Sequence, residues 1–213
     1  MIAFFRSLDA GLSLVWFHRF SVPIHLFLEG LKAKLASPRR FKDTYKIETA
    51  VLFDEMEPVI GQLEKVSLIG YVSTVDKSNA EEEETITTEL IERLLGKWES
   101  VQGIQDDCIY MMWTWDNRLE GSDKEDMFIG FRVSDDSEAP GDMVKKTLPK
   151  GGYAVYSMNP AEIEPETWDE MYMQLFSKES GLEESAPFML QRHVSDEQVD
   201  IYIPVKEAEE QPE

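Results

Sequence analysis

One order of predicted secondary structure occurs twice along the chain, and this repeat limits the fold more than any other feature of the sequence. Residues 65–76 are rich in β-branched side chains and predict a strand. Residues 86–101 carry apolar side chains three and four positions apart, which is the spacing of a helix. Residues 108–116 and 127–135 then predict the two strands of a hairpin.

The same order follows in the second half of the chain. Residues 143–159 predict a strand that is interrupted by Pro149 and two glycines. Residues 165–181 predict a helix, because they begin with proline, end with glycine and carry one apolar stripe. Residues 187–194 and 198–206 predict a second hairpin.

The two halves match in pattern rather than in identical residues. Ile109 in the first copy and Phe188 in the second occupy similar places, about 79 positions apart. Two such strand-helix-strand-strand units pair naturally in one sheet. The predicted fold class is therefore α+β, with one continuous antiparallel sheet, both helices on one face and a ligand groove between the copies. Residues 45–61, before the first copy, could add a strand and a turn.

Charge divides the chain near Lys42. Residues 1–42 hold seven basic and two acidic residues, a net charge of +5, whereas the rest hold 14 basic and 40 acidic residues, a net charge of −26. The predicted organisation is a basic, apolar N-terminal extension over 1–42, one domain over 43–206 and a disordered acidic tail over 207–213. The longest uncharged run of the extension is too short to span a membrane. Packing as helices, or a loosely held extension, is favoured over contact with a membrane surface.

The composition excludes several function classes. A formal net charge of −21 repels phosphate backbones, so the acidic body is not expected to bind nucleic acid. A single cysteine, Cys108, allows no internal disulfide and is consistent with a reducing, cytoplasmic location. The three histidines, His18, His25 and His193, have no metal-ligand spacing, and we expect neither a metal nor a cofactor.

Residues 187–194 hold the most unusual polar side chains of the predicted strands. Gln191 and His193 are two positions apart, so they share one face of the strand in an apolar setting. Trp113 and Trp115 share a face in the same way and could stack on a flat ligand. Two interpretations stay open at this point: a ligand pocket, or ordinary half-buried strand residues with backbone or water partners.

In their order, several segments resemble the GyrI-like small-molecule-binding domain, which also forms the effector-binding part of AraC-type and multidrug-responsive regulators. The resemblance covers residues 65–206 and is most specific in "LPKGGYAVY" and "DIYIPV". It implies a duplication of SHS2-type units and a stand-alone protein that binds a hydrophobic or aromatic small molecule. The residues that would line the pocket are Gln191, His193, Trp113, Trp115, Phe131, Tyr153 and Tyr156.

The resemblance also exposes a departure from the family. Members often carry a glutamate, and a tyrosine two residues later, on the strand after the second helix, and that glutamate can pair with lipophilic cations. Gln191 and His193 fall on those positions here. An amide cannot neutralise a cation, so the pocket is expected to prefer neutral polar-aromatic molecules.

Two other functions remain open beside binding. Some GyrI-like proteins hydrolyse strained cyclopropane-bearing natural products, and His193 is the residue that could transfer a proton in such a reaction. Other relatives are linked to gyrase protection or inhibition, which would make the chain a protein–protein interaction module. Binding is favoured, because Gln191 cannot act as a general acid.

Overall fold

The computed structural model describes residues 57–76, 79–115, 124–160 and 165–207. The predicted N-terminal extension over 1–42 and the tail beyond Glu207 lie outside the described residues.

The described elements follow the predicted order in both copies. The first copy contains β2 and α2, a short 3-10 helix η3, and the hairpin of β3 and β4, with β1 before it. The second copy contains β5, β6, α3, β7 and the hairpin of β8 and β9. The bounds are β1 Val59–Leu63, β2 Val66–Asp76, α2 Ala80–Lys97, η3 Trp98–Ser100, β3 Ile109–Thr114, β4 Lys124–Val133, β5 Val144–Leu148, β6 Gly151–Met158, α3 Pro165–Leu175, β7 Leu182–Glu184, β8 Phe188–His193 and β9 Val199–Glu207.

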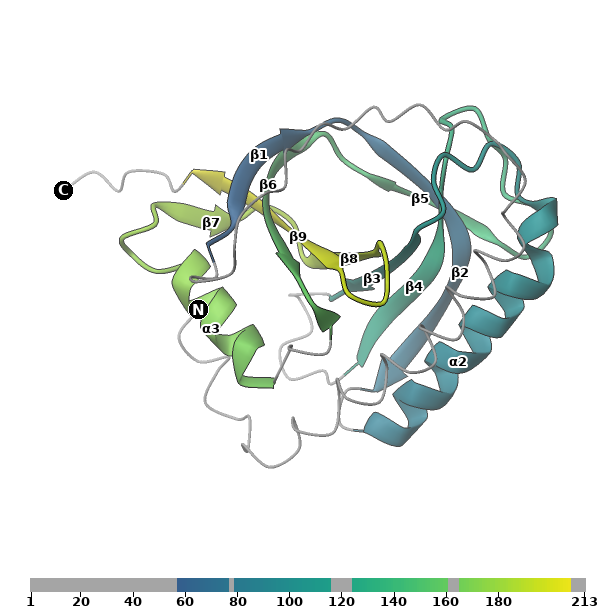
Figure 1. Cartoon of the computed structure of the whole chain (residues 1–213), viewed down its shortest axis with the longest axis horizontal. Coiled ribbons are helices and arrows are strands. Elements are labelled where there is room, and N and C mark those ends of the chain that lie inside the picture. The colour runs from purple at the N-terminus through teal and green to yellow at the C-terminus, as the bar shows by residue number, and fades with distance from the viewer. Residues whose placement is uncertain (1–56, 77–78, 116–123, 161–164, 208–213) are drawn as a thin grey trace.

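Among the described residues, nine strands form one antiparallel sheet. Its order is β1-β6-β9-β8-β3-β4-β2-β5, and β7 pairs with β9. The two copies meet where β3 pairs with β8. Figure 1 shows the sheet curled on itself, with α2 and α3 outside the curl. The predicted α+β fold with one antiparallel sheet is confirmed.

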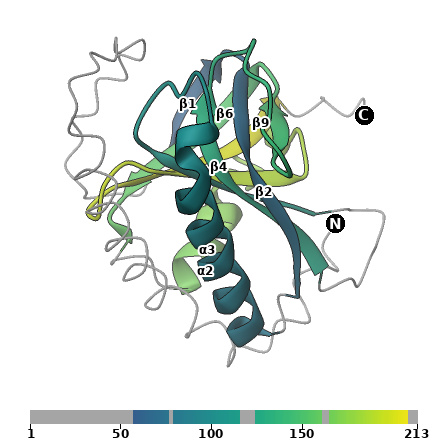
Figure 2. The ribbon, with the colours of Figure 1, turned by 90° about the vertical axis from the view of Figure 1, so that its right-hand side faces the viewer.

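Both helices lie on one face of this sheet. Leu90 and Leu94 of α2 pack in one cluster with Met111 of β3, and Met171 of α3 packs in another with Ile201 of β9. Met111 pairs with Gln191, and Gln191 pairs with Ile201. Cross-strand partners project to the same face, so the two clusters share one face, as predicted. Figure 2 shows α2 running lengthwise in front of this side of the sheet.

The opposite face lies inside the curl and has an apolar cluster of its own. We call this side the inner face and the helix-covered side the outer face (Figure 1). The buried side chains of the inner cluster are Leu68, Cys108, Tyr110, Met112, Phe128, Leu148, Tyr153, Val155, Phe188, Leu190 and Tyr202. Both faces of the sheet are therefore packed with side chains, and successive residues of each strand point alternately to the inner and the outer face.

Helix α2 begins earlier than the sequence pattern indicates. The helical spacing predicts a helix from residue 86 and leaves the acidic residues 77–85 as a polar loop, but α2 starts at Ala80. The side chain of Asn79 caps it by accepting a hydrogen bond from the backbone N–H of Glu82 at 3.2 Å. The glutamates that follow complement the positive end of the helix dipole, so the acidic run stabilises a helix start. Glu83 is buried rather than solvated.

The second copy also differs in two boundaries. The single strand predicted over 143–159 is divided into β5 and β6, which pair with β2 and β9 respectively. Pro149 lies at the break, where its missing N–H costs no ladder hydrogen bond. Helix α3 ends at Leu175 rather than Gly181, and Gly181 has a positive φ of 64° just before β7.

Candidate ligand-binding site

The outer face of β3 and β8 lies between the two helices. Helix α2 contacts mainly β2 and β4, whereas α3 packs on the cluster formed by β6 and β9. The side chains that β3 and β8 present here form what we call the inter-helix strip. Its residues are Ile109, Met111, Trp113, Met189, Gln191 and His193. Met189 packs against the clusters of both helices, so the strip joins the two halves of the outer face.

Three polar side chains of the strip are buried without hydrogen-bond partners. Gln191 is 3% exposed, His193 6% and Trp113 9%. Among the residues that the structure describes, Gln191 Nε2, His193 Nε2 and Trp113 Nε1 have no hydrogen-bond partner. An unsatisfied buried donor or acceptor costs about 1–3 kcal/mol, and native proteins hold few of them. Their concentration in one strip marks it as a place for a polar molecule.

The strip carries no formal charge of its own at neutral pH. Complete burial lowers the pKa of His193 from its ordinary value to about 4. The imidazole is therefore neutral at pH 7, and one ring nitrogen can donate while the other accepts. A histidine of this kind does not hold a proton to give at neutral pH, which weakens its case as a general acid.

The strip contains the two central residues of a cross-strand row. From either end, this row begins with a tyrosine followed by an isoleucine. The row starts at a tyrosine on the first strand of one copy and ends at a tyrosine on the first long strand of the other. Its members, in order, are Tyr71, Ile129, Met111, Gln191, Ile201 and Tyr156. Gln191 in the second copy is thus the counterpart of Met111 in the first copy. The two copies differ at this position, which is apolar in the first and polar in the second.

This row corrects the correspondence between the two copies by one residue. Ile109 lies on the outer face, but Phe188, its expected counterpart, packs in the inner cluster. Neighbouring residues of a strand point to opposite faces, so a shift of one residue exchanges the faces. The counterpart of Ile109 in the second copy, on the same outer face, is therefore Met189.

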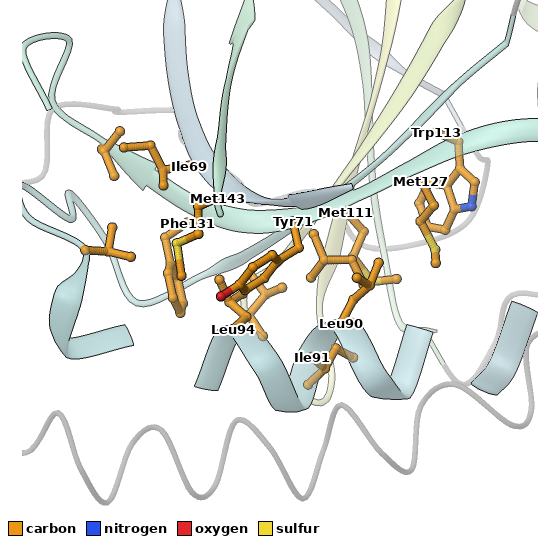
Figure 3. Close-up of a cluster of buried hydrophobic side chains, with 14 of the residues drawn as sticks. Ile69, Tyr71, Leu90, Ile91, Leu94, Met111, Trp113, Met127, Phe131 and Met143 are labelled. Atoms are coloured by element: carbon orange, nitrogen blue, oxygen red, sulfur yellow. The ribbon is translucent and has the colours of Figure 1, made fainter. Parts of the chain in front are cut away.

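The other predicted pocket residues are distributed unevenly. Tyr156 is buried on the outer face, where its hydroxyl lies 3.5 Å from the carbonyl oxygen of Met171. Phe131 is also on the outer face but packs deep in the α2 cluster, near Met143 (Figure 3). Trp115 follows β3 and is half-buried, with its backbone N–H donating to Pro187. Tyr153 belongs to the inner cluster, so it does not share a wall with Gln191.

Figure 3 places Trp113 at one end of the α2 cluster, beyond Met127. Two buried glutamates approach the strip at this end. Glu125 is two residues before Met127 on β4, and Glu83 is one helical turn before Thr87, whose hydroxyl lies 3.4 Å from the Met127 sulfur. Each glutamate already makes an interaction, but the Oε2 atom of Glu83 has no hydrogen-bond partner among the described residues. The strip therefore has an acidic end and a neutral end.

A polar network on the inner face escaped the sequence analysis. Arg192 lies between Gln191 and His193 on β8, so its side chain points to the opposite side of the sheet. Its guanidinium nitrogens lie 3.8 Å from Asp106 Oδ2 and 3.5 Å from Asp200 Oδ2. The hydroxyl of Tyr110 donates to Asp106 at 2.7 Å. The strand register aligns Tyr110, Arg192 and Asp200 in one row, and the sequence alone does not give this register.

This network ties together the three central strands. Burial raises the pKa of Asp106, although Tyr110 and Arg192 oppose that rise. Ser157 also donates to Asp200 at 2.7 Å. Because β3, β8 and β9 all contribute, the network fixes the register that holds Gln191 and His193 on the outer face.

Acidification is expected to destabilise the protein through His193. The unfolded chain binds a proton at this histidine near its ordinary pKa of 6.5, whereas the folded chain resists protonation until about pH 4. Stability from this group is therefore complete above about pH 6.5 and falls as the pH drops towards 4. Between pH 7.5 and pH 5 the loss is about 2 kcal/mol.

Urea unfolding at several pH values measures this loss, with His193→Gln as the matched variant. Burial raises the pKa of Glu184 to about 7, which acts in the opposite direction, but Glu184 is present in both proteins and cancels in the difference. Equal pH profiles for the two proteins would contradict a neutral, buried His193.

Two classes of site or anchor are not found in the part of the chain that the structure covers. No described helix is both long and apolar enough to cross a membrane. No three His, Cys, Asp or Glu side chains of the described residues come together as metal ligands.

A comparison with models of known protein families finds a match over most of the described residues. The family model described as "Integron-associated effector binding protein" (Cass2) matches residues 59–205. No curated protein sequence matches the chain.

Several solved structures are similar to the chain at low sequence identity. The C-terminal domain of EcmrR is 10% identical, with a TM-score of 0.53, and the alignment covers 71% of this chain and 98% of that domain. The integron cassette protein VCH_CASS2 from the mobile metagenome of Vibrio cholerae is 18% identical, with a TM-score of 0.47, 70% of this chain and 96% of that chain being covered. SAV2435, solved bound to tetraphenylphosphonium, is 17% identical, with a TM-score of 0.49, and the alignment covers 71% of this chain and 94% of SAV2435.

Proposed function

The chain belongs to the family of integron-associated effector binding proteins, and from this premise we propose that it binds a hydrophobic or aromatic small molecule on the inter-helix strip. The observation that carries the proposal is the set of buried polar atoms without partners on Trp113, Gln191 and His193. A ligand that satisfies these atoms would recover part of the free energy that they cost in the free protein.

The surroundings of these atoms suit a flat, largely apolar ligand. Met111 and Met189 supply flexible and polarizable walls that adapt to different shapes. Trp113 offers an aromatic face at one end of the strip, and half-buried Trp115 follows just beyond the end of β3. Tyr156 closes the row on the side of α3. Pockets for small molecules combine apolar walls with a few polar groups in this way.

The remaining parts of the proposal rest on composition. A net charge of −21 and a single buried cysteine favour a cytoplasmic protein that does not bind nucleic acid through its acidic body. Residues 43–206 are proposed to form the binding domain, with residues 1–42 as a separate basic extension. Hydrolysis is a weaker candidate than binding, because His193 is neutral at pH 7.

Binding of the neutral dye N-phenyl-1-naphthylamine tests this function. We expect the dye to bind saturably and to quench tryptophan fluorescence, and Trp113→Leu to weaken binding roughly threefold to tenfold, since an aromatic pair contributes about 0.5–1.5 kcal/mol beyond burial. Trp98→Leu tests the other location that a dye could occupy, because Trp98 lines a cavity with Val101 and Ile104 at the far end of α2.

The expected result is a lower affinity in Trp113→Leu and an unchanged affinity in Trp98→Leu, with both variants folded by circular dichroism. A wild-type protein that binds no dye would contradict the binding function. Equal affinities of wild type and Trp113→Leu would contradict the location.

A further inference from the structure

We propose that the cavity at the C-terminal end of α2 is a second ligand site, separate from the inter-helix strip, and that it binds a small protonated aromatic amine. This inference goes beyond the proposed function, because it concerns other residues and does not depend on binding at the strip.

This cavity, which we call the α2-end cavity, lies where the chain leaves α2 and enters η3. Its volume is about 500 Å³. Cavities that bind small molecules measure roughly 300–1,000 Å³, so the space accommodates one aromatic ring with a short arm. None of the lining residues belongs to the strip; they are Trp98, Glu99, Val101, Gln102, Gly103 and Ile104.

The apolar part of the lining is anchored in the core. Val101 is 6% exposed, and Trp98 and Ile104 are half-buried and pack against the α2 cluster. An indole can stack on a second aromatic ring, and its face also attracts a cation. The half-buried indole of Trp98 therefore offers both contacts that an aromatic amine can make.

Main-chain contacts hold the cavity in shape without a ligand. The carbonyl oxygen of Gly103 accepts a hydrogen bond from the backbone N–H of Ser134 at 2.8 Å, and Ile104 forms a β-bridge with Val133. Gly103 has a positive φ of 74°, which favours glycine at this turn. The site is preformed, so little ordering of the chain opposes binding.

The polar part of the lining carries one negative charge. The side chains of Glu99 and Gln102 are exposed, and neither makes a hydrogen bond or an ion pair with another described residue. The C-terminal end of α2 adds a partial negative charge beside them. Lys97, the basic residue closest in sequence, does not line the cavity and makes no ion pair with Glu99 within the described residues. A positive charge next to an apolar ring suits this arrangement.

Three probes of similar shape test the choice of charge. They are the cation 2-phenylethylammonium, its neutral N-acetyl amide and the anion 3-phenylpropanoate. Two-dimensional ¹H–¹⁵N NMR titration of the full chain at millimolar probe concentrations reports both the affinity and the location. We expect 2-phenylethylammonium to shift the amide signals of residues 98–104 saturably, and to bind at least about threefold more tightly than either of the other probes.

The variant Glu99→Gln removes the charge and keeps the size of the side chain. Affinity for 2-phenylethylammonium is expected to fall about twofold to fivefold, and its salt dependence to weaken. Glu89→Gln is the matched control, because Glu89 is an exposed glutamate of α2 outside the cavity. Trp98→Leu is expected to lower the affinity about threefold to tenfold, whereas Trp113→Leu leaves it unchanged.

The outcomes separate the α2-end cavity from the strip. Saturating N-phenyl-1-naphthylamine is expected to leave the affinity for 2-phenylethylammonium unchanged. If the ammonium is displaced by the dye, shifts the amides of β8 instead, or shifts no signal saturably, there is no second site and the proposed function is unaffected. Equal affinities of wild type and Glu99→Gln, or of the cation and its neutral amide, overturn the selection of charge. If the ammonium titrates residues 98–104 while the dye binds nowhere, the second site stands and the proposed function fails.

Discussion

Replacing Arg192 by leucine is expected to lower the free energy of unfolding by about 3–5 kcal/mol, the range for breaking a buried ion pair from one side. Arg192 lies close to two carboxylates of the inner face, Asp106 and Asp200, whose side chains are 16% and 10% exposed. Without the guanidinium, both negative charges stay largely desolvated. Asp200 loses its counter-charge, and Asp106 keeps only Arg132, whose Nη1 lies 3.9 Å from Oδ2. Leucine fills part of the volume, so the loss is mainly electrostatic.

Urea unfolding at pH 7 measures this effect, with Lys65→Met as the control. The Lys65 pair with Asp135 is 3.1 Å long but exposed by 51% and 60%, so its removal is expected to cost less than about 1 kcal/mol. The loss in Arg192→Leu should shrink as the pH falls, because burial already raises the pKa of Asp106 and protonation removes the uncompensated charge. Equal losses in the two variants would mean that the network does not hold the central strands.

Replacing Gln191 by glutamate is expected to raise the affinity for the planar lipophilic cation N-methylacridinium by about tenfold to a hundredfold. A charge-assisted contact in a partly desolvated site contributes roughly 1.5–3 kcal/mol, whereas cation–π attraction to Trp113 is available to both proteins and does not enter the difference. Affinity for the neutral ketone N-methylacridone is expected to fall, because the carboxylate of Glu only accepts hydrogen bonds and the amide N–H donor of Gln191 is lost. One substitution would thus exchange the preference of the strip from neutral molecules to cations.

The gain should depend on pH in a defined direction. Burial, together with nearby Glu83 and Glu125, raises the pKa of a new carboxyl group in the free protein. The added affinity is therefore present above that raised pKa and lost as the pH falls through it. Titrations of wild type, Gln191→Glu and the uncharged control Gln191→Met at pH 8 and pH 5.5 measure this. An unchanged preference in Gln191→Glu at both pH values would show that residue 191 does not line a ligand site.

Much of the fold was predictable because it follows from local pattern. The β-branched runs, the helical spacing over 86–101 and the proline at the start of α3 each report short-range physics. The acidic run before residue 86 misled the prediction, since Asn79 caps a helix there and the glutamates complement its dipole. Composition alone could not distinguish a solvated loop from a capped helix start.

The candidate site was predictable only in part. Alternation correctly placed Gln191 and His193 on one face, because strand period does not depend on the rest of the molecule. Alternation alone also puts Tyr153 and Tyr156 on opposite faces, because they lie three residues apart on β6. Which of the two shares a face with Gln191 depends on the pairing of β6 with β9, which no local pattern gives. The lack of partners at Trp113 depends on side chains from distant segments, which no local pattern encodes.

The alternation along β8 makes this strand a convenient frame for laboratory evolution. Positions 189, 191 and 193 face the helices, whereas Leu190 and Arg192 serve the inner face. A library that randomises only the odd positions would vary recognition while the even positions keep the scaffold intact. A one-residue deletion in the same strand would exchange the two roles at once and is expected to yield no folded clones. Repertoires of new binders are therefore best sought by substitution in β8, with its length held constant.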